Sequence, residues 1–113
     1  MRWLLLLSLV GCQSFTAPPS DRLNPPVEYL AWWDATVACA GQSGDVGRIT
    51  WFVTANRFAS PDGTVAGWWE PSHTIYLAGL ATNDEKTVRH EMLHDLLQTG
   101  EHPAAFDICG LRF

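Results

Sequence analysis

The sequence predicts a small α+β domain with an N-terminal helix, a short sheet and a second helix near the C-terminus. Apolar residues recur at helical spacing over residues 27–40 and again over 83–98. Between them, residues 48–77 are rich in β-branched and aromatic side chains and are interrupted by a Pro-Asp-Gly turn at 61–63. A chain of 113 residues has room for one modest core.

Residues 1–11 resemble a bacterial lipoprotein signal peptide. Arg2 precedes an apolar run too short to cross a bilayer as a mature helix, and residues 9–12 read LVGC, as in a lipobox. This resemblance implies cleavage before Cys12, which would then carry the lipid anchor, and Gln13 is compatible with outer-membrane sorting. We therefore expect a protein of the bacterial cell envelope, on the periplasmic face of the outer membrane. An ordinary cleaved signal or an N-terminal membrane anchor are the alternatives.

Residues 12–26 are rich in Pro, Ser and other polar residues, which predicts a tether between the membrane and a domain at 27–113. The net charge is −5, and loss of Arg2 with the signal makes the mature chain more negative. This acidity argues against nucleic acid as a partner. We expect a monomer.

The first helix is predicted over residues 27–40, with Asn24-Pro25 as its entry signal and Gly41 as its exit. Residues 48–55 and 67–77 predict strands of an antiparallel or mixed sheet, joined by a loop at 56–66. The apolar positions of the first helix are Leu30, Trp33, Val37 and Ala40, and we expect Trp33 and Trp51 to fill the core.

The second helix is predicted from about residue 83 to about 98. Asp84 and its two predecessors offer capping oxygens, Thr82 and Glu85 have capping-box spacing, and Gly100 is a natural stop. The predicted apolar stripe consists of Val88, Met92, Leu93, Leu96 and Leu97.

This helix carries the motif His90-Glu91-Met92-Leu93-His94. Residues four apart lie on nearly the same helix face, so both imidazoles can bind one metal ion while Glu91 lies beside the open coordination position. The motif predicts a zinc site with Glu91 as general base. The alternative is an amphipathic surface helix with solvated side chains.

A catalytic zinc usually has three protein ligands. His102 is the leading candidate, because a left-handed turn at Gly100 would return the chain towards the helix. Glu101 and Asp107 are the fallback ligands.

These residues resemble the zincin metallopeptidases, and most closely the metzincins, in which a glycine turn delivers the third histidine. His102 falls two residues later than in the metzincin string HExxHxxGxxH, and a Met-turn is absent because Met1 and Met92 are the only methionines. The resemblance covers about 90–102 and implies a reduced zincin: a zinc-dependent enzyme that hydrolyses peptide or related amide bonds.

The resemblance also implies that the strand before the metal helix, residues 73–78, borders the cleft and binds an extended peptide substrate. His73 or Tyr76 would then be candidates for an oxyanion stabiliser. A solvated strand end and a packing ring are the simpler interpretations. Trp68 and Trp69 would face opposite sides of a strand, so one of them could supply an apolar subsite or contact cell-wall material.

With Cys12 assigned to lipid, Cys39 and Cys109 are left as one pair in an oxidising compartment, which predicts a disulfide. Such a bond would tie the first helix to the segment that follows the zinc loop. The alternative is Cys109 as a thiolate zinc ligand.

The function predicted from the sequence is a membrane-anchored zinc peptidase that acts on a peptide or protein substrate. The rival is a non-catalytic zinc-binding lipoprotein that serves as an interaction domain. A cell-wall hydrolase would share the same site and differ in substrate.

Overall fold

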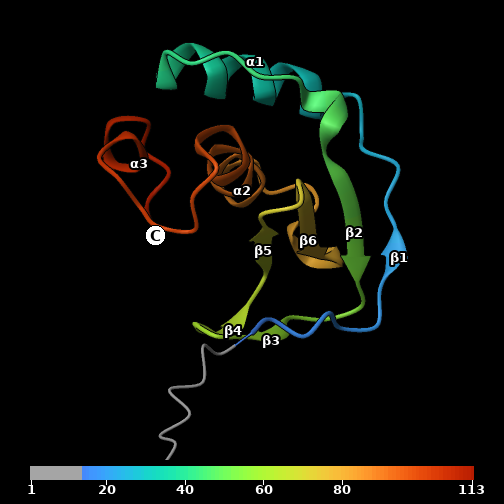
Figure 1. Cartoon of the computed structure of the whole chain (residues 1–113). Coiled ribbons are helices and arrows are strands. Elements are labelled where there is room, and N and C mark those ends of the chain that lie inside the picture. The colour runs from blue at the N-terminus through green and yellow to red at the C-terminus, as the bar shows by residue number, and fades with distance from the viewer. Residues whose placement is uncertain (1–13) are drawn as a thin grey trace, which may run out of the picture.

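The computed structural model describes residues 14–113, so the predicted signal peptide and Cys12 lie outside the described residues. The chain forms a small α+β domain, as the sequence predicts, with a mixed sheet packed against helices (Figure 1). None of the helices over residues 14–113 is both long and apolar enough to span a membrane.

The main sheet has the strand order β1-β2-β6-β5. The central strands β2 and β6 are parallel, whereas β1 pairs antiparallel with β2 and β5 pairs antiparallel with β6. The four strands are β1 (Asp21–Arg22), β2 (Thr50–Thr54), β5 (Gly67–Glu70) and β6 (Thr74–Ala78).

Two strand predictions need correction. The predicted loop 56–66 contains a hairpin, β3 (Phe58–Ser60) paired with β4 (Gly63–Val65), which forms a second small sheet. The predicted strand 67–77 is two strands, because the chain reverses in a turn in which His73 has a φ of 58°. A non-glycine residue rarely adopts this backbone conformation, so local sequence gives little warning of the reversal.

Both predicted helices form within two residues of their expected bounds, as α1 (Glu28–Ala40) and α2 (Glu85–Leu97), and a short α3 (Ala105–Ile108) follows. The buried stripe of α1 differs from the predicted one, since Leu30 is 55% exposed while Tyr29 and Thr36 are buried with Trp33. The predicted capping box is absent, because the Thr82 hydroxyl donates to the Gly79 carbonyl instead. The apolar stripe of α2 is confirmed: Val88, Met92, Leu93 and Leu96 are fully buried and Leu97 packs against the core.

Strand alternation gives the sheet two different faces. The face towards α1 and α2 carries Trp51, Ile75 and Trp69 in one cross-strand row, and all three are buried. The opposite face carries the next row, in which Tyr76 stacks on Phe52 and is flanked by Trp68. Trp51 and Trp33 are both core residues, as predicted.

The described part of the predicted tether, residues 14–26, lies against the domain. The ring of Phe15 packs against Trp68, Phe58 and Tyr76 on the outer face of the sheet, with centroid separations of 5.1–6.1 Å. Farther along, β1 pairs with β2 and Leu23 packs against the core. The segment therefore contacts the domain at Phe15 and again at residues 21–23.

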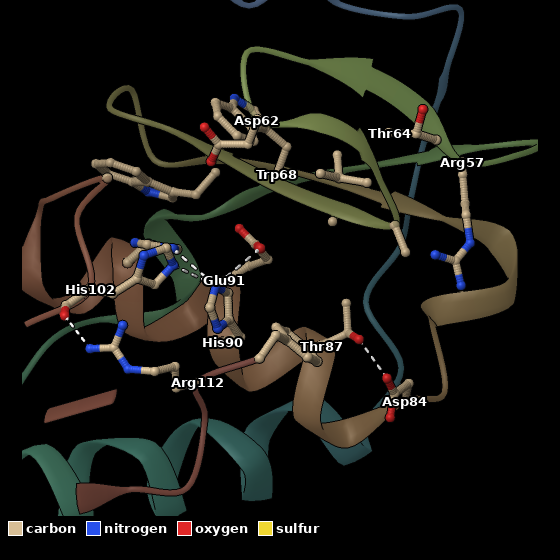
Figure 2. Close-up of a pocket in the computed structure, with 17 residues that line it drawn as sticks. Arg57, Asp62, Thr64, Trp68, Asp84, Thr87, His90, Glu91, His102 and Arg112 are labelled. Atoms are coloured by element: carbon tan, nitrogen blue, oxygen red, sulfur yellow. Dashed lines mark hydrogen bonds and ion pairs between the residues drawn. The ribbon is translucent and has the colours of Figure 1, made fainter. Parts of the chain in front are cut away.

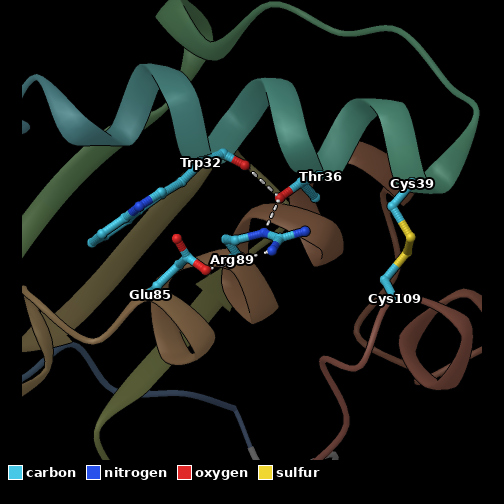
Figure 3. The surroundings of a disulfide bond; sticks show 6 residues. All are labelled: Trp32, Thr36, Cys39, Glu85, Arg89 and Cys109. Carbon is cyan, nitrogen blue, oxygen red and sulfur yellow. Dashed lines mark hydrogen bonds and ion pairs between the residues drawn. A yellow bond between two sulfur atoms is a disulfide. The ribbon is translucent and has the colours of Figure 1, made fainter.

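The predicted disulfide is confirmed. Cys39, near the end of α1, is bonded to Cys109, directly after α3, with a Cα–Cα distance of 5.8 Å (Figure 3). The pair is 70 residues apart in sequence. The bond therefore joins the N-terminal helix to the chain segment that follows the predicted metal ligands.

Candidate metal centre

The histidines of the α2 motif converge in space. The Nε2 atoms of His90 and His94 lie 3.2 Å apart, as expected for residues one helical turn apart on the same face. Both residues are about 6% exposed, and α2 is covered by the sheet on one side and by α1 on the other. The two residues therefore form a largely buried pair on one face of α2.

His102 joins this pair from the loop after α2. Its Nε2 lies 3.1 Å from the Nε2 of His90, and Figure 2 shows its side chain beside His90 and Glu91. One ligand atom from each of the three histidines lies within 4.8 Å of the other two. The structure thus brings together three residues that are able to hold a metal ion.

The chain reversal that delivers His102 differs from the predicted one. Gln98 has the left-handed conformation at the end of α2, with φ 53°, whereas no left-handed conformation is found at Gly100. The Gln98 amide bonds to the main-chain oxygen of Asp95, so its side chain secures the unusual backbone. A side chain that hydrogen-bonds to the local backbone can compensate for left-handed strain in this way, although glycine is the residue expected from sequence.

Two backbone carbonyls orient the histidines of α2. The Nδ1–H of His90 donates to the Leu111 carbonyl at 2.5 Å, and the Nδ1–H of His94 donates to the Thr99 carbonyl at 2.7 Å. Because a carbonyl only accepts, each ring carries its proton on Nδ1 and presents a bare Nε2 lone pair. Burial lowers the pKa of both rings to about 4, which keeps them neutral and able to bind a metal near pH 7.

Glu91 is the second unusual group of the site. Its side chain is 7% exposed, and Oε2 is buried without a hydrogen-bond partner among the described residues. Burial raises the pKa of this carboxyl to about 8. Its Oε1 lies 4.0 Å from the His90 Nε2. A buried carboxylate oxygen without a partner is costly, so this arrangement indicates a site that is completed by a bound species.

A cleft of about 570 Å³ opens above these residues. The histidines and Glu91 form its floor, and the hairpin and β5 form the facing wall (Figure 2). Side chains at its rim include Arg57 and Arg112 as well as Asp62 and Asp84. The cleft is large enough for several residues of a peptide or for a small polar molecule.

The strand beside the cleft is β5, not residues 73–78 as predicted. Strand β6 lies inside the sheet between β2 and β5, so its backbone hydrogen bonds are already used. His73 and Tyr76 are likewise absent from the cleft lining. His73 bonds to Asp95, and Tyr76 packs on the outer face of the sheet, so neither is placed to stabilise an oxyanion.

The fallback ligands are also away from the histidine cluster. Asp107 pairs with Arg112, and Glu101 does not belong to the metal-capable group. Cys109 is oxidised in the disulfide, which excludes it as a thiolate ligand. The adjacent residues Trp68 and Trp69 both line the cleft. Trp69 also stacks on the His94 ring, with a centroid distance of 6.0 Å.

Asp95 is a part of the site that the sequence pattern did not reveal. Its buried carboxylate accepts hydrogen bonds from Arg48, Trp69 and His73, each at 2.9 Å. These donors come from three different parts of the chain and fasten the end of α2 to the sheet. Only the position of an acidic residue directly after His94 could have drawn attention to it.

No protein-family model, curated protein or solved structure matches this chain. Its assignment to a function therefore depends on the site itself.

Proposed function

We propose that this protein is a metal-dependent hydrolase, with zinc at the three histidines, that cleaves peptide or related amide bonds. The observation that supports this most is the combination of three converging imidazoles with a buried, unpartnered carboxylate. A purely structural metal site would normally be closed by a fourth protein ligand, whereas this one faces a cleft.

The donor set fits zinc. Zinc–nitrogen bonds of about 2.0–2.1 Å in tetrahedral geometry place two ligand nitrogens about 3.3 Å apart. The separations of 3.2 Å and 3.1 Å that link His90 to the other two histidines are close to this value. When bound at such a site, zinc polarises a carbonyl group and lowers the pKa of a water ligand.

Glu91 would act as the general base. Its carboxylate would take a proton from an attacking water molecule and then deliver it to the departing amine. A nearby divalent cation would lower the pKa of Glu91 from its value of about 8 in the metal-free protein, which favours the basic form near neutral pH.

An extended peptide substrate would bind alongside β5. Within residues 14–113, this strand is at the edge of the sheet and pairs only with β6, so its other side offers main-chain donors and acceptors next to the cleft. Main-chain pairing provides affinity with little dependence on sequence. We therefore expect broad activity against unfolded protein.

The test is zinc content and peptidase activity of the soluble protein, measured on wild type, Glu91→Gln and His94→Ala. We expect about one zinc per wild-type chain, retention of zinc without activity in Glu91→Gln, and loss of both in His94→Ala. Glu85→Gln is the matched control, because Glu85 is an exposed carboxylate on the same helix. Full activity in Glu91→Gln would exclude the proposed mechanism.

A non-catalytic zinc-binding interaction domain is the second candidate. It is favoured by the disulfide and the histidine cluster together, since both tie the short α3 region to the rest of a small domain. Zinc binding with a large loss of stability on chelation, and no hydrolysis of peptide, protein or cell-wall substrates, would support it.

We further propose that the protein is anchored in the bacterial envelope through lipid on Cys12. The contact of Phe15 with the sheet would then hold the domain close to the membrane. Mass spectrometry of the membrane fraction should find acylated Cys12, and Cys12→Ser should release the protein into the soluble fraction.

A further inference from the structure

The C-terminal segment, residues 105–113, surrounds the histidine cluster. Phe106 is fully buried, and its ring centroid lies 4.7–4.9 Å from each of the three histidine rings. The Leu111 carbonyl accepts a hydrogen bond from the Nδ1–H of His90. The geometry of the histidine cluster therefore depends on a segment that supplies none of its three histidines.

Within this segment, Arg112 makes a forked contact with two partners. Its Nε donates to Asp107 Oδ1 at 2.6 Å and its Nη2 donates to Asp107 Oδ2 at 3.0 Å. The same Nη2 donates to the backbone carbonyl of His102 at 2.7 Å, a contact visible in Figure 2. A planar guanidinium holds such a geometry more rigidly than an ammonium group would.

His102 needs this support more than the other two histidines. His90 and His94 belong to a buried helix, and each is oriented through Nδ1 by a carbonyl. His102 lies outside any helix or strand, and among residues 14–113 its Nδ1 has no hydrogen-bond partner. Apart from the packing of Phe106 against its ring, the position of His102 therefore depends on its backbone, which Arg112 holds through the carbonyl.

We propose that Arg112 is a positioning residue that fixes His102 as the third metal ligand. The inference rests on the proposed metal site. Asp107 holds the guanidinium in place from the end of α3, and the nearby disulfide at Cys109 fastens the same segment to α1. Arg112 thus increases metal affinity without touching the metal, by reducing the freedom that His102 would lose on binding.

The experiment is a double-mutant cycle read out as the zinc dissociation constant, measured by competition with a chromophoric chelator. The variants are Arg112→Met, which keeps the apolar stem without donors, His102→Ala, and both together. Arg22→Met is the control, because Arg22 is an exposed arginine in β1, on the opposite edge of the sheet from β5. Thermal unfolding of the metal-free variants reports any general loss of structure.

We expect Arg112→Met to weaken zinc binding on the order of 10–100-fold, the range found when residues that orient metal ligands are removed. In the His102→Ala background the same substitution should have no further effect, because its target is gone. The proposal is overturned if Arg112→Met binds zinc as tightly as wild type, or weakens it equally in both backgrounds. If His102→Ala itself leaves affinity unchanged, the three-histidine site fails, and this inference fails with it.

Discussion

Gly67 of β5 lies directly against Glu91 of α2. A Cβ atom at position 67 would lie 3.1 Å from Glu91 Cγ and 3.3 Å from its Oε1, closer than side chains usually pack. The absence of a side chain at this position allows the sheet to cover the carboxyl group, which explains how an acidic side chain becomes buried at the edge of an open cleft.

Substitution Gly67→Ala should therefore displace Glu91 while leaving the histidines in place. We expect the kcat of peptide hydrolysis to fall about 10- to 100-fold, since small displacements of a catalytic group have effects of this size. Zinc content should remain that of wild type. Gly79→Ala is the control, because a Cβ there meets only the Thr54 carbonyl at an ordinary 3.5 Å. Unchanged kcat in Gly67→Ala would show that the carboxylate has room to adjust.

Removal of the disulfide should destabilise the fold and the metal site together. For a loop of 70 residues, the chain-entropy model predicts a loss of about 4.4 kcal/mol in the free energy of unfolding for Cys39→Ser/Cys109→Ser. Urea denaturation of the metal-free protein measures this loss. We also expect weaker zinc binding, because the disulfide anchors the segment that contacts all three histidines.

Chemically reduced wild-type protein provides the matched comparison for the double serine variant. If both unfold at the urea concentration of the oxidised protein, the cross-link does not contribute to stability.

Substitution Asp95→Asn should lower stability by about 3 kcal/mol or more. The change leaves Arg48 without its charged partner. It also replaces a carboxylate that accepts hydrogen bonds from Trp69 and His73 with an amide, which has only one acceptor oxygen. Activity should also fall, because Trp69 packs against His94. Equilibrium denaturation and zinc titration separate the two effects. Asp34→Asn, on the exposed face of α1, should unfold like wild type.

The stability of the metal-free protein should depend on pH through the site. The pKa of His90 and His94 falls from 6.5 to about 4 on folding, so between these values the unfolded chain holds protons that the folded state does not. Stability therefore rises with pH up to about 6.5. The pKa of Glu91 rises from 4.5 to about 8, so above pH 4.5 its contribution falls as pH increases.

The two histidines outweigh the single carboxyl up to about pH 6.5, and above it Glu91 alone lowers stability until about pH 8. The contribution of the site should therefore be greatest near pH 6.5. Urea unfolding across this pH range, in the presence of a chelator, tests the expectation. In Glu91→Gln the decline above pH 6.5 should disappear; its persistence would mean that another group causes it.

The sequence by itself determined the features that depend on local spacing or on elimination. Helical period places His90, Glu91 and His94 together on α2 whatever packs around them. The disulfide followed from counting, since Cys39 and Cys109 were the remaining thiols. The two helices were found because apolar residues at helical spacing and terminal signals agree within a single segment.

Tertiary structure decided what depends on non-local pairing. The sequence predicts that the strand at residues 73–78 borders the cleft. In the structure, β6 pairs in parallel with β2 and lies inside the sheet, which leaves β5 at the edge. The donors to Asp95 come from distant segments, and the partners of Arg112 lie five and ten residues away in no recognised pattern, so no short motif encodes either set. Local spacing can specify which chemical groups share a helix face, whereas their burial and orientation arise only when distant segments pack around them.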